Sequence, residues 1–132
     1  MPFSVHVEEA HFNVLDAGSP EDRKGRSMVK LSSENALQTL LKTNADFARL
    51  LEKDTFDVSI YKPDKVDLQS PHVRDELYVV VSGSGRFRCD GEIQPVGVSD
   101  VLFVAAGVEH RFEDFTDDFS TWVVFLGPRG AH

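Results

Sequence analysis

Residues 71–110 give the clearest indication of the fold, and they read PHVRDELYVV VSGSGRFRCD GEIQPVGVSD VLFVAAGVEH. Apolar, β-branched and aromatic runs alternate in it with Ser-Gly-Ser-Gly and Asp-Gly, which are turn sequences between short strands. Residues two apart on a strand leave the same face. His72 and Glu76 therefore share one face, while Leu77 and Val79 leave the other face, which the sequence predicts to be core.

A third polar side chain, His110, begins a later strand just after a turn at Gly107, where glycine tolerates a positive φ. Strands joined by hairpins can bring His72, Glu76 and His110 together in the mouth of a small barrel. On an ideal extended strand His72 and Glu76 lie about 13 Å apart. The prediction therefore requires a bend between them, for which Pro71 and the residues after His72 are suited.

The spacing of these residues resembles the two sequence motifs of the cupins, a family of small metal-binding β-barrels. The first motif is Gly, five residues, His-x-His, three or four residues, Glu, six residues and Gly. The chain fits it at His72, Glu76 and Gly83. The second motif is Gly, five residues, Pro-x-Gly, two residues, His, three residues and Asn. Here Gly107 and His110 fit, and Asp114 stands where Asn is usual.

Four positions depart from the motifs while the spacing is kept: Asp64 replaces Gly, Ser70 replaces the first His, Ser99 replaces Gly, and Ala105 replaces Pro. One of the four usual metal ligands is therefore missing. The resemblance covers residues 56–127 well and the N-terminal third hardly at all. It implies an all-β, cupin-type jelly-roll barrel (a double-stranded β-helix), but no single activity, because this fold hosts many chemistries.

Length and composition limit the class of protein. We expect the 132 residues to form one domain, with the barrel core at 56–127 after an N-terminal strand and a helical segment in 1–55. The 14 basic against 22 acidic side chains repel phosphate, so nucleic acid is not an expected partner. No apolar run reaches the length of a membrane span, and the single Cys89 cannot form an internal disulfide. The expected compartment is the cytoplasm.

The segment before the barrel shows two patterns. Residues 3–7 alternate like a strand that pairs at a sheet edge or with another subunit. Leucines and other apolar residues in 33–53 recur at helical spacing, and a capping-box-like sequence follows a break near Thr43 and Asn44. This pattern predicts two short helices that pack on the outside of the barrel; a lid over its mouth is the alternative.

From Phe56 onward the hydrophobic period is that of strands, and about nine short strands fit a small jelly roll. Several strands, including residues 119–126, are apolar on both faces. One small barrel interior cannot absorb this excess. We therefore expect a homodimer in which the strand around residues 3–7 and an apolar sheet face form a twofold contact.

Two imidazoles and one carboxylate are suitable ligands for a divalent transition metal, namely Fe, Mn, Zn or Ni. We predict such an ion on His72, Glu76 and His110, with the amide oxygen of Gln69 as a weak substitute for the missing ligand. Imidazoles bind metal only when neutral, so affinity should fall as the pH drops through the histidine range. The alternatives are core histidines and a Glu76 paired with Arg74 or Arg111.

Tyr78 and Phe112 share the face of the presumed ligands and are the candidate residues for contacting a small-molecule substrate or ligand. Three classes of function remain open. The chain could be a metal-dependent enzyme, an oxygenase or an isomerase, in which an open metal position polarises a carbonyl or binds oxygen. It could also be a non-catalytic module that binds a small ligand, or a metal-free barrel that serves assembly.

Overall fold

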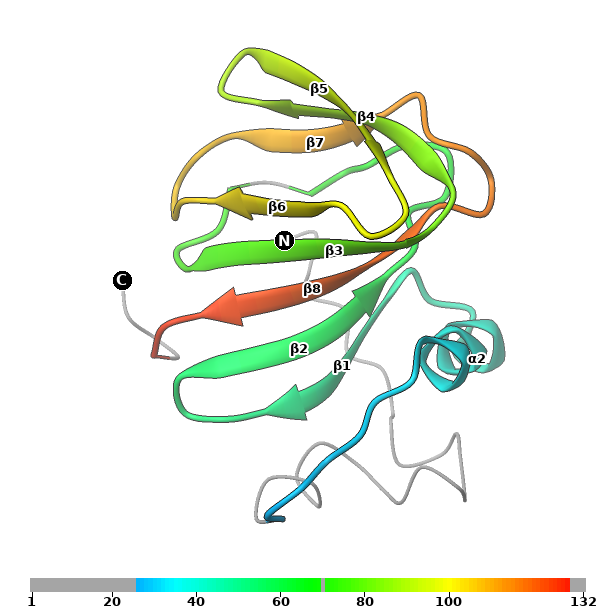
Figure 1. Cartoon of the computed structure of the whole chain (residues 1–132), viewed down its shortest axis with the longest axis vertical. Coiled ribbons are helices and arrows are strands. Elements are labelled where there is room, and N and C mark those ends of the chain that lie inside the picture. Colours follow the sequence, from blue (N-terminus) through cyan, green and yellow to red (C-terminus); the bar gives the residue numbers. More distant parts are fainter. Residues whose placement is uncertain (1–25, 70, 129–132) are drawn as a thin grey trace.

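The computed structural model describes residues 26–69 and 71–128. It contains a five-stranded antiparallel sheet, β1-β2-β8-β3-β6, and a three-stranded antiparallel sheet, β5-β4-β7 (Figure 1). The bounds are α2 Ser33–Thr43, β1 Phe47–Glu52, β2 Phe56–Tyr61, β3 Asp75–Ser82, β4 Ser84–Cys89, β5 Glu92–Gly97, β6 Val101–Val104, β7 His110–Glu113 and β8 Ser120–Leu126. The predicted all-β jelly roll is confirmed, and no residue between 72 and 115 is helical.

The helix α2 begins and ends where local chemistry allows. The Ser32 side chain accepts a hydrogen bond from the Asn35 N–H and so caps the first turn. Asn44 follows in the left-handed conformation (φ 55°), and its backbone N–H bonds to the Leu40 carbonyl. The buried side chains Ala36 and Leu40 pack on the outer side of the large sheet. The first predicted helix is therefore correct, and it packs outside the barrel.

The second predicted helix is wrong, because Phe47–Glu52 forms strand β1 and pairs antiparallel with β2. Asn44 ends the first helix instead of preceding a second one. The apolar residues of β1 are buried on both faces: Phe47 joins the barrel core, while Ala48 packs in the cluster beneath α2. A short strand buried on both faces has no two-residue alternation, so its spacing imitated a helix. The sheet consequently starts at Phe47 rather than Phe56.

The main core lies between the two sheets. The large sheet contributes Tyr78, Val80, Val104, Val123 and Phe125, and the small sheet contributes Phe87, Val96 and Phe112. These side chains are inward because alternate residues of each strand leave opposite faces. In β3 this rule buries Glu76 along with Tyr78, so the strand carries a carboxylate into an apolar interior.

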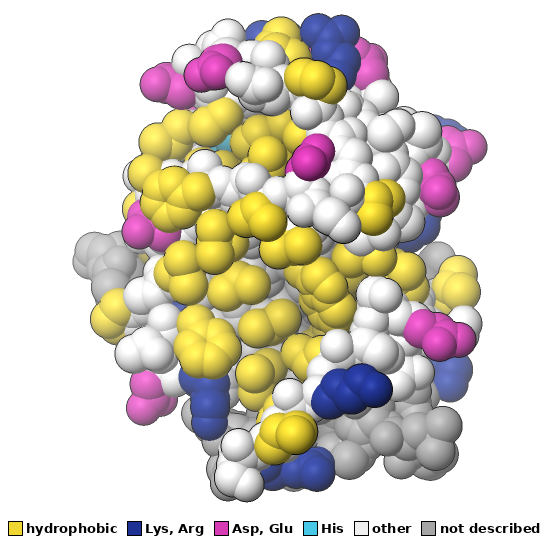
Figure 2. Space-filling view, viewed as in Figure 1, with side chains coloured by type: hydrophobic (Ala, Val, Ile, Leu, Met, Phe, Trp, Pro, Cys, Tyr) yellow, Lys and Arg dark blue, Asp and Glu magenta, His cyan; other side chains and the backbone are white. Residues whose placement is uncertain are grey.

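The other face of β3 is not core, contrary to the prediction for Leu77 and Val79. Both are half-buried on the outside of the large sheet. The registers place them in two rows that cross four strands: Val58, Val124, Leu77 and Phe103, then Ile60, Trp122, Val79 and Val101. Figure 2 shows apolar side chains gathered over this face. We call these two rows the outer apolar face.

Two turns of the barrel require glycine. Asp90 and Gly91 join β4 to β5 with φ values of 51° and 85°, as a two-residue hairpin of type I′ requires. Gly83 separates β3 from β4 at φ 77°, and an added Cβ there would lie 2.7 Å from the Phe119 Cα. Among the described residues, no helix is long and apolar enough to cross a membrane. The predicted strand at residues 3–7 lies outside the described residues.

Candidate metal centre

The chain bends just before β3, and this bend brings His72 close to Glu76. His72 lies outside the strand, and residues 73 and 74 form a bend that leads into it. The Arg74 guanidinium anchors this bend, because it donates to Asp57 Oδ2 at 2.8 Å and to the Gly127 carbonyl at 2.8 Å. As a result His72 Nε2 lies 3.6 Å from Glu76 Oε2.

The same contacts bear on the alternative in which Glu76 is the structural partner of an arginine. Arg74 forms its ion pair with Asp57, with side chains only 10% and 4% exposed. Arg111 is exposed on β7. The buried Glu76 instead faces two histidines and a tyrosine.

His110 is delivered from the opposite sheet. It is the first residue of β7 and follows Gly107, whose φ of 82° confirms the predicted turn. The Gly107 N–H donates to the His72 carbonyl at 2.7 Å, and the Ala106 N–H donates to Asp75 Oδ1 at 2.8 Å. These two hydrogen bonds join the loop that carries His72 to the loop that carries His110. The two imidazoles are therefore held in a fixed relation by the backbone.

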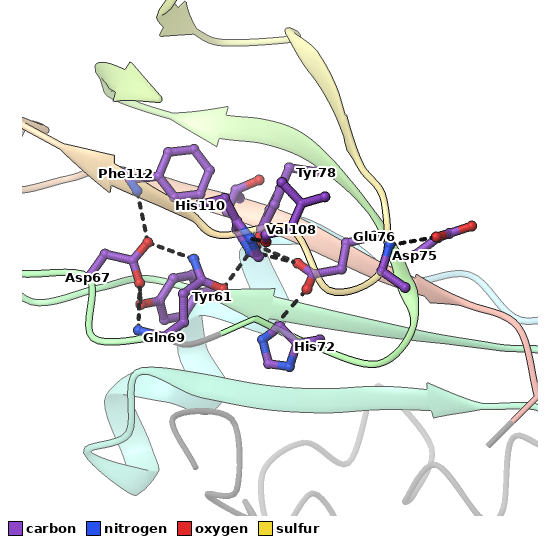
Figure 3. Close-up of polar contacts among 12 residues, drawn as sticks. Tyr61, Asp67, Gln69, His72, Asp75, Glu76, Tyr78, Val108, His110 and Phe112 are labelled. Carbon is purple, nitrogen blue, oxygen red and sulfur yellow. Dashed lines mark hydrogen bonds and ion pairs between the residues drawn. The ribbon is translucent and has the colours of Figure 1, made fainter. Parts of the chain in front are cut away.

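The three predicted ligands do come together. One candidate ligand atom from each of His72, Glu76 and His110 lies within 4.8 Å of the others, and all three side chains are buried (Figure 3). His110 Nε2 is 3.4 Å from Glu76 Oε1. Within residues 26–69 and 71–128, these three side chains are the group of histidine, cysteine and carboxylate ligands that could hold a metal.

The tautomer of neutral His110 follows from its neighbours. Its Nδ1 is 2.8 Å from the Val108 carbonyl oxygen, which can only accept a hydrogen bond. Nδ1 must therefore carry a proton, and the neutral ring presents the lone pair of Nε2 to the cluster. A backbone carbonyl that orients a metal-binding imidazole in this way is a common second layer of metal sites.

The Tyr78 hydroxyl lies at the centre of the cluster, where more acceptor atoms surround it than its single proton can satisfy. Its oxygen is 2.6 Å from Glu76 Oε1, 2.9 Å from Gln69 Oε1 and 3.0 Å from His110 Nε2. A hydroxyl donates one hydrogen bond, yet these three atoms are acceptors when His110 is neutral and Glu76 is ionised. The buried cluster therefore needs additional positive charge, either a proton on His110 or a cation. The donor set thus fits a metal ion.

Asp67 is a site residue that the sequence analysis missed. Its buried carboxylate accepts from the Tyr61 hydroxyl at 2.7 Å, the Gln69 N–H at 3.1 Å, Gln69 Nε2 at 2.6 Å and the Phe112 N–H at 2.8 Å. The bond from Nε2 fixes the Gln69 amide, so Gln69 Oε1 faces Tyr78. The available signal was parity, because Asp67 and Gln69 leave the same face of an extended segment.

Gln69, the predicted fourth ligand, lies beside the cluster and reaches it through Tyr78 (Figure 3). The two predicted substrate-contacting residues are fully buried, with Tyr78 0% and Phe112 1% exposed. Their rings meet edge to face at 5.0 Å, and the Phe112 ring also contacts Phe87 and Phe119. Phe112 is therefore a core residue that packs against the ring of Tyr78.

The surroundings shift the pKa values of the two histidines in opposite directions. Burial, the largest influence, lowers the pKa of His72, and the nearby Glu76 carboxylate opposes it. Burial also acts to lower the pKa of His110, but hydrogen bonds to Glu76 and the Val108 carbonyl raise it overall. Burial and then Glu76 raise the pKa of Tyr78 well above its ordinary value, so its hydroxyl keeps its proton.

Fold and cluster together define a small antiparallel barrel with a His–Glu–His group between its sheets. A family model described as a cupin domain matches residues 58–125, which is more than half of the chain. The chain therefore belongs to the cupin family. The chain is also 34% identical, over 84 residues, to the uncharacterized protein SCO3923 of Streptomyces coelicolor; the match covers 62% of this chain and 80% of that protein.

Solved structures share the fold at lower identity. KdgF from Halomonas sp. is 17% identical with a TM-score of 0.57, and the match covers 64% of this chain and 79% of that chain. An RmlC-like cupin from Shewanella frigidimarina is 19% identical with a TM-score of 0.53, covering 64% of this chain and 77% of that one. At these identities the similarity shows the fold only and does not assign an activity to this chain.

Proposed function

We propose that this cupin binds one divalent transition metal through His72, Glu76 and His110 and uses it to bind or convert a small organic molecule. The observation that carries the proposal is the proton shortage around Tyr78, where three acceptor atoms share one hydroxyl proton. A buried carboxylate is costly without a compensating charge. A cation supplies that charge directly.

The ligand types favour Fe, Mn, Zn or Ni, because imidazole and carboxylate together suit these ions. Three protein ligands leave further positions for water, oxygen or a substrate, and the metal would there act as a Lewis acid and template. The chain itself supplies orientation: Val108 fixes the His110 tautomer, and the backbone bond between Gly107 and His72 holds the two histidine loops together.

Two functional classes fit this centre. In the first, the protein is a metal-dependent oxygenase or isomerase; in the second, it binds a small ligand without converting it. A turnover screen with sugars, keto acids and catechols separates them, because only an enzyme consumes a substrate in proportion to its metal content. The third class, a metal-free barrel that serves assembly, leaves the proton shortage to be met by a protonated His110.

The test is the metal content of the freshly purified chain, followed by titration with Zn²⁺ in competition with a chelator. Glu76→Gln removes the charge of the buried carboxylate at nearly constant volume. Glu113→Gln is the matched control on the surface of β7, where Glu113 pairs with Arg88. We expect Glu76→Gln and His110→Ala to lose stable binding and Glu113→Gln to retain it. A wild-type chain that holds no metal would contradict the proposal.

A further inference from the structure

The hydroxyl of Tyr78 occupies a position that packing alone does not require. The ring is fully buried between Phe87 and Phe112, which explains an aromatic residue here. Those contacts would be equally good for phenylalanine. The hydroxyl instead reaches the ligand atoms of Glu76 and His110 directly.

The spacing of the three atoms is that of neighbouring ligands on one ion. Tyr78 Oη, Glu76 Oε1 and His110 Nε2 are separated by 2.6, 3.0 and 3.4 Å. Ligand atoms about 2.1 Å from a common metal lie about 3.0 Å apart at right angles and about 3.4 Å apart in a tetrahedron. The two distances to His110 match these values, and the hydrogen bond to Glu76 is the one that must lengthen.

Gln69 provides the place for the hydroxyl proton. Asp67 holds the Gln69 amide through Nε2 at 2.6 Å, so Gln69 Oε1 faces the Tyr78 hydroxyl at 2.9 Å. When the proton points to Gln69, the lone pairs of Tyr78 Oη are directed toward Glu76 and His110. A neutral hydroxyl can then offer its oxygen to a cation while it keeps its hydrogen bond to Gln69.

We propose that Tyr78 Oη is a further ligand of the metal, with Gln69 and Asp67 as the positioning residues that hold its proton away from the ion. This inference rests on the proposed metal centre. It also assigns an oxygen ligand to a chain in which Ser70 stands at the position of the motif's first histidine. The resulting set contains two imidazoles, one carboxylate and one hydroxyl, which adds no charge to the site.

The experiment compares Tyr78→Phe with Tyr61→Phe, because Tyr61 and Tyr78 are the only tyrosines of the chain and both are buried. Tyr61 donates to Asp67 and so belongs to the same network one step further from the ligands. Co²⁺ alone is titrated into each apo protein, its affinity is measured by chelator competition, and its visible absorption spectrum is recorded. Thermal melts without metal verify that both variants fold.

We expect Tyr78→Phe to weaken Co²⁺ binding at least about tenfold and to change the band positions, while Tyr61→Phe stays within about threefold with an unchanged spectrum. Equal or tighter binding by Tyr78→Phe would overturn the inference while leaving the metal centre intact. Equal losses in both variants would also overturn it, because they would indicate general loosening of the barrel. If the wild-type protein binds no Co²⁺, the proposed metal centre itself is refuted, and the role of Tyr78 with it.

Discussion

At the scale of single residues, the cluster depends on groups that never touch a ligand atom. Asp67 is 3% exposed and accepts four hydrogen bonds. Three come from the nearby Tyr61 and Gln69, and the fourth comes from Phe112, which is distant in sequence. Its bond to the Phe112 N–H joins the segment before β3 to strand β7. Without this carboxylate its buried donors would lose their acceptor. Asp67 therefore contributes to stability as well as to the orientation of Gln69.

Asp67→Asn replaces one oxygen of this carboxylate with an amide nitrogen of the same size. Whichever position the nitrogen takes, it faces two donors that lose their acceptor. We expect a loss of about 2 to 3 kcal/mol in the free energy of unfolding, measured by urea denaturation of the metal-free chain. Asp117→Asn, on an exposed turn, is the control and should change stability by less than about 0.5 kcal/mol. Equal stabilities would show that the network is not structural.

At the scale of elements, the glycine turns of the structure agree with the sequence pattern. Asp90-Gly91 and Gly107 have the positive φ that their positions in the pattern predict. Gly83 has a second constraint, since β3 and β4 part there and the chain from Thr116 to Phe119 lies against it. No side chain can be added at Gly83 without moving the Phe119 backbone.

Gly83→Ala and Gly91→Ala separate these two effects. Both residues have positive φ, which costs any other residue about 1 to 2 kcal/mol. At Gly91 nothing lies within 4 Å of an added Cβ, whereas at Gly83 it would meet the Phe119 backbone at 2.7 Å. We expect Gly83→Ala to lower the free energy of unfolding by clearly more than Gly91→Ala does, in the same urea titration. Equal losses would mean that the close approach has no energetic weight.

At the scale of the whole molecule, the outer apolar face forms a broad apolar patch in Figure 2, and within it Ile60 alone is fully buried, in the cluster beneath α2. Phe103 and Val101 are 58% and 61% exposed, and none of the eight side chains in the two rows is charged. The chain as a whole carries a net charge of −8. Two copies can therefore meet across this face without bringing charged side chains of these rows together, and a twofold contact pairs the same patch on both copies.

We propose that a second copy of the chain covers the outer apolar face, and we expect sedimentation of the wild type to give a homodimer at micromolar concentrations. Phe103→Glu places a charge in the proposed interface and should yield monomers. Leu41→Glu, at an apolar position on α2 that is 74% exposed, should leave the dimer intact. A monomeric wild type would refute the dimer.

The residue pattern alone was enough to predict the strands from Phe56 onward, the glycine turns and the three residues of the His–Glu–His cluster. Each of these follows from local rules: two-residue alternation, positive φ at glycine, and motif spacing. It also indicated that a bend must bring His72 to Glu76, and the structure provides it between residues 72 and 75.

The remaining features depend on contacts between segments that are distant in the sequence. Phe47–Glu52 is a strand because it pairs with β2 and because the barrel core and α2 bury its two faces, and no spacing within the segment carries that information. Asp67 and the Tyr78 hydroxyl acquire their roles from partners in other segments. The charge balance of the cluster depends on which acceptors meet one proton. That is a property of distances in space, which a sequence does not state.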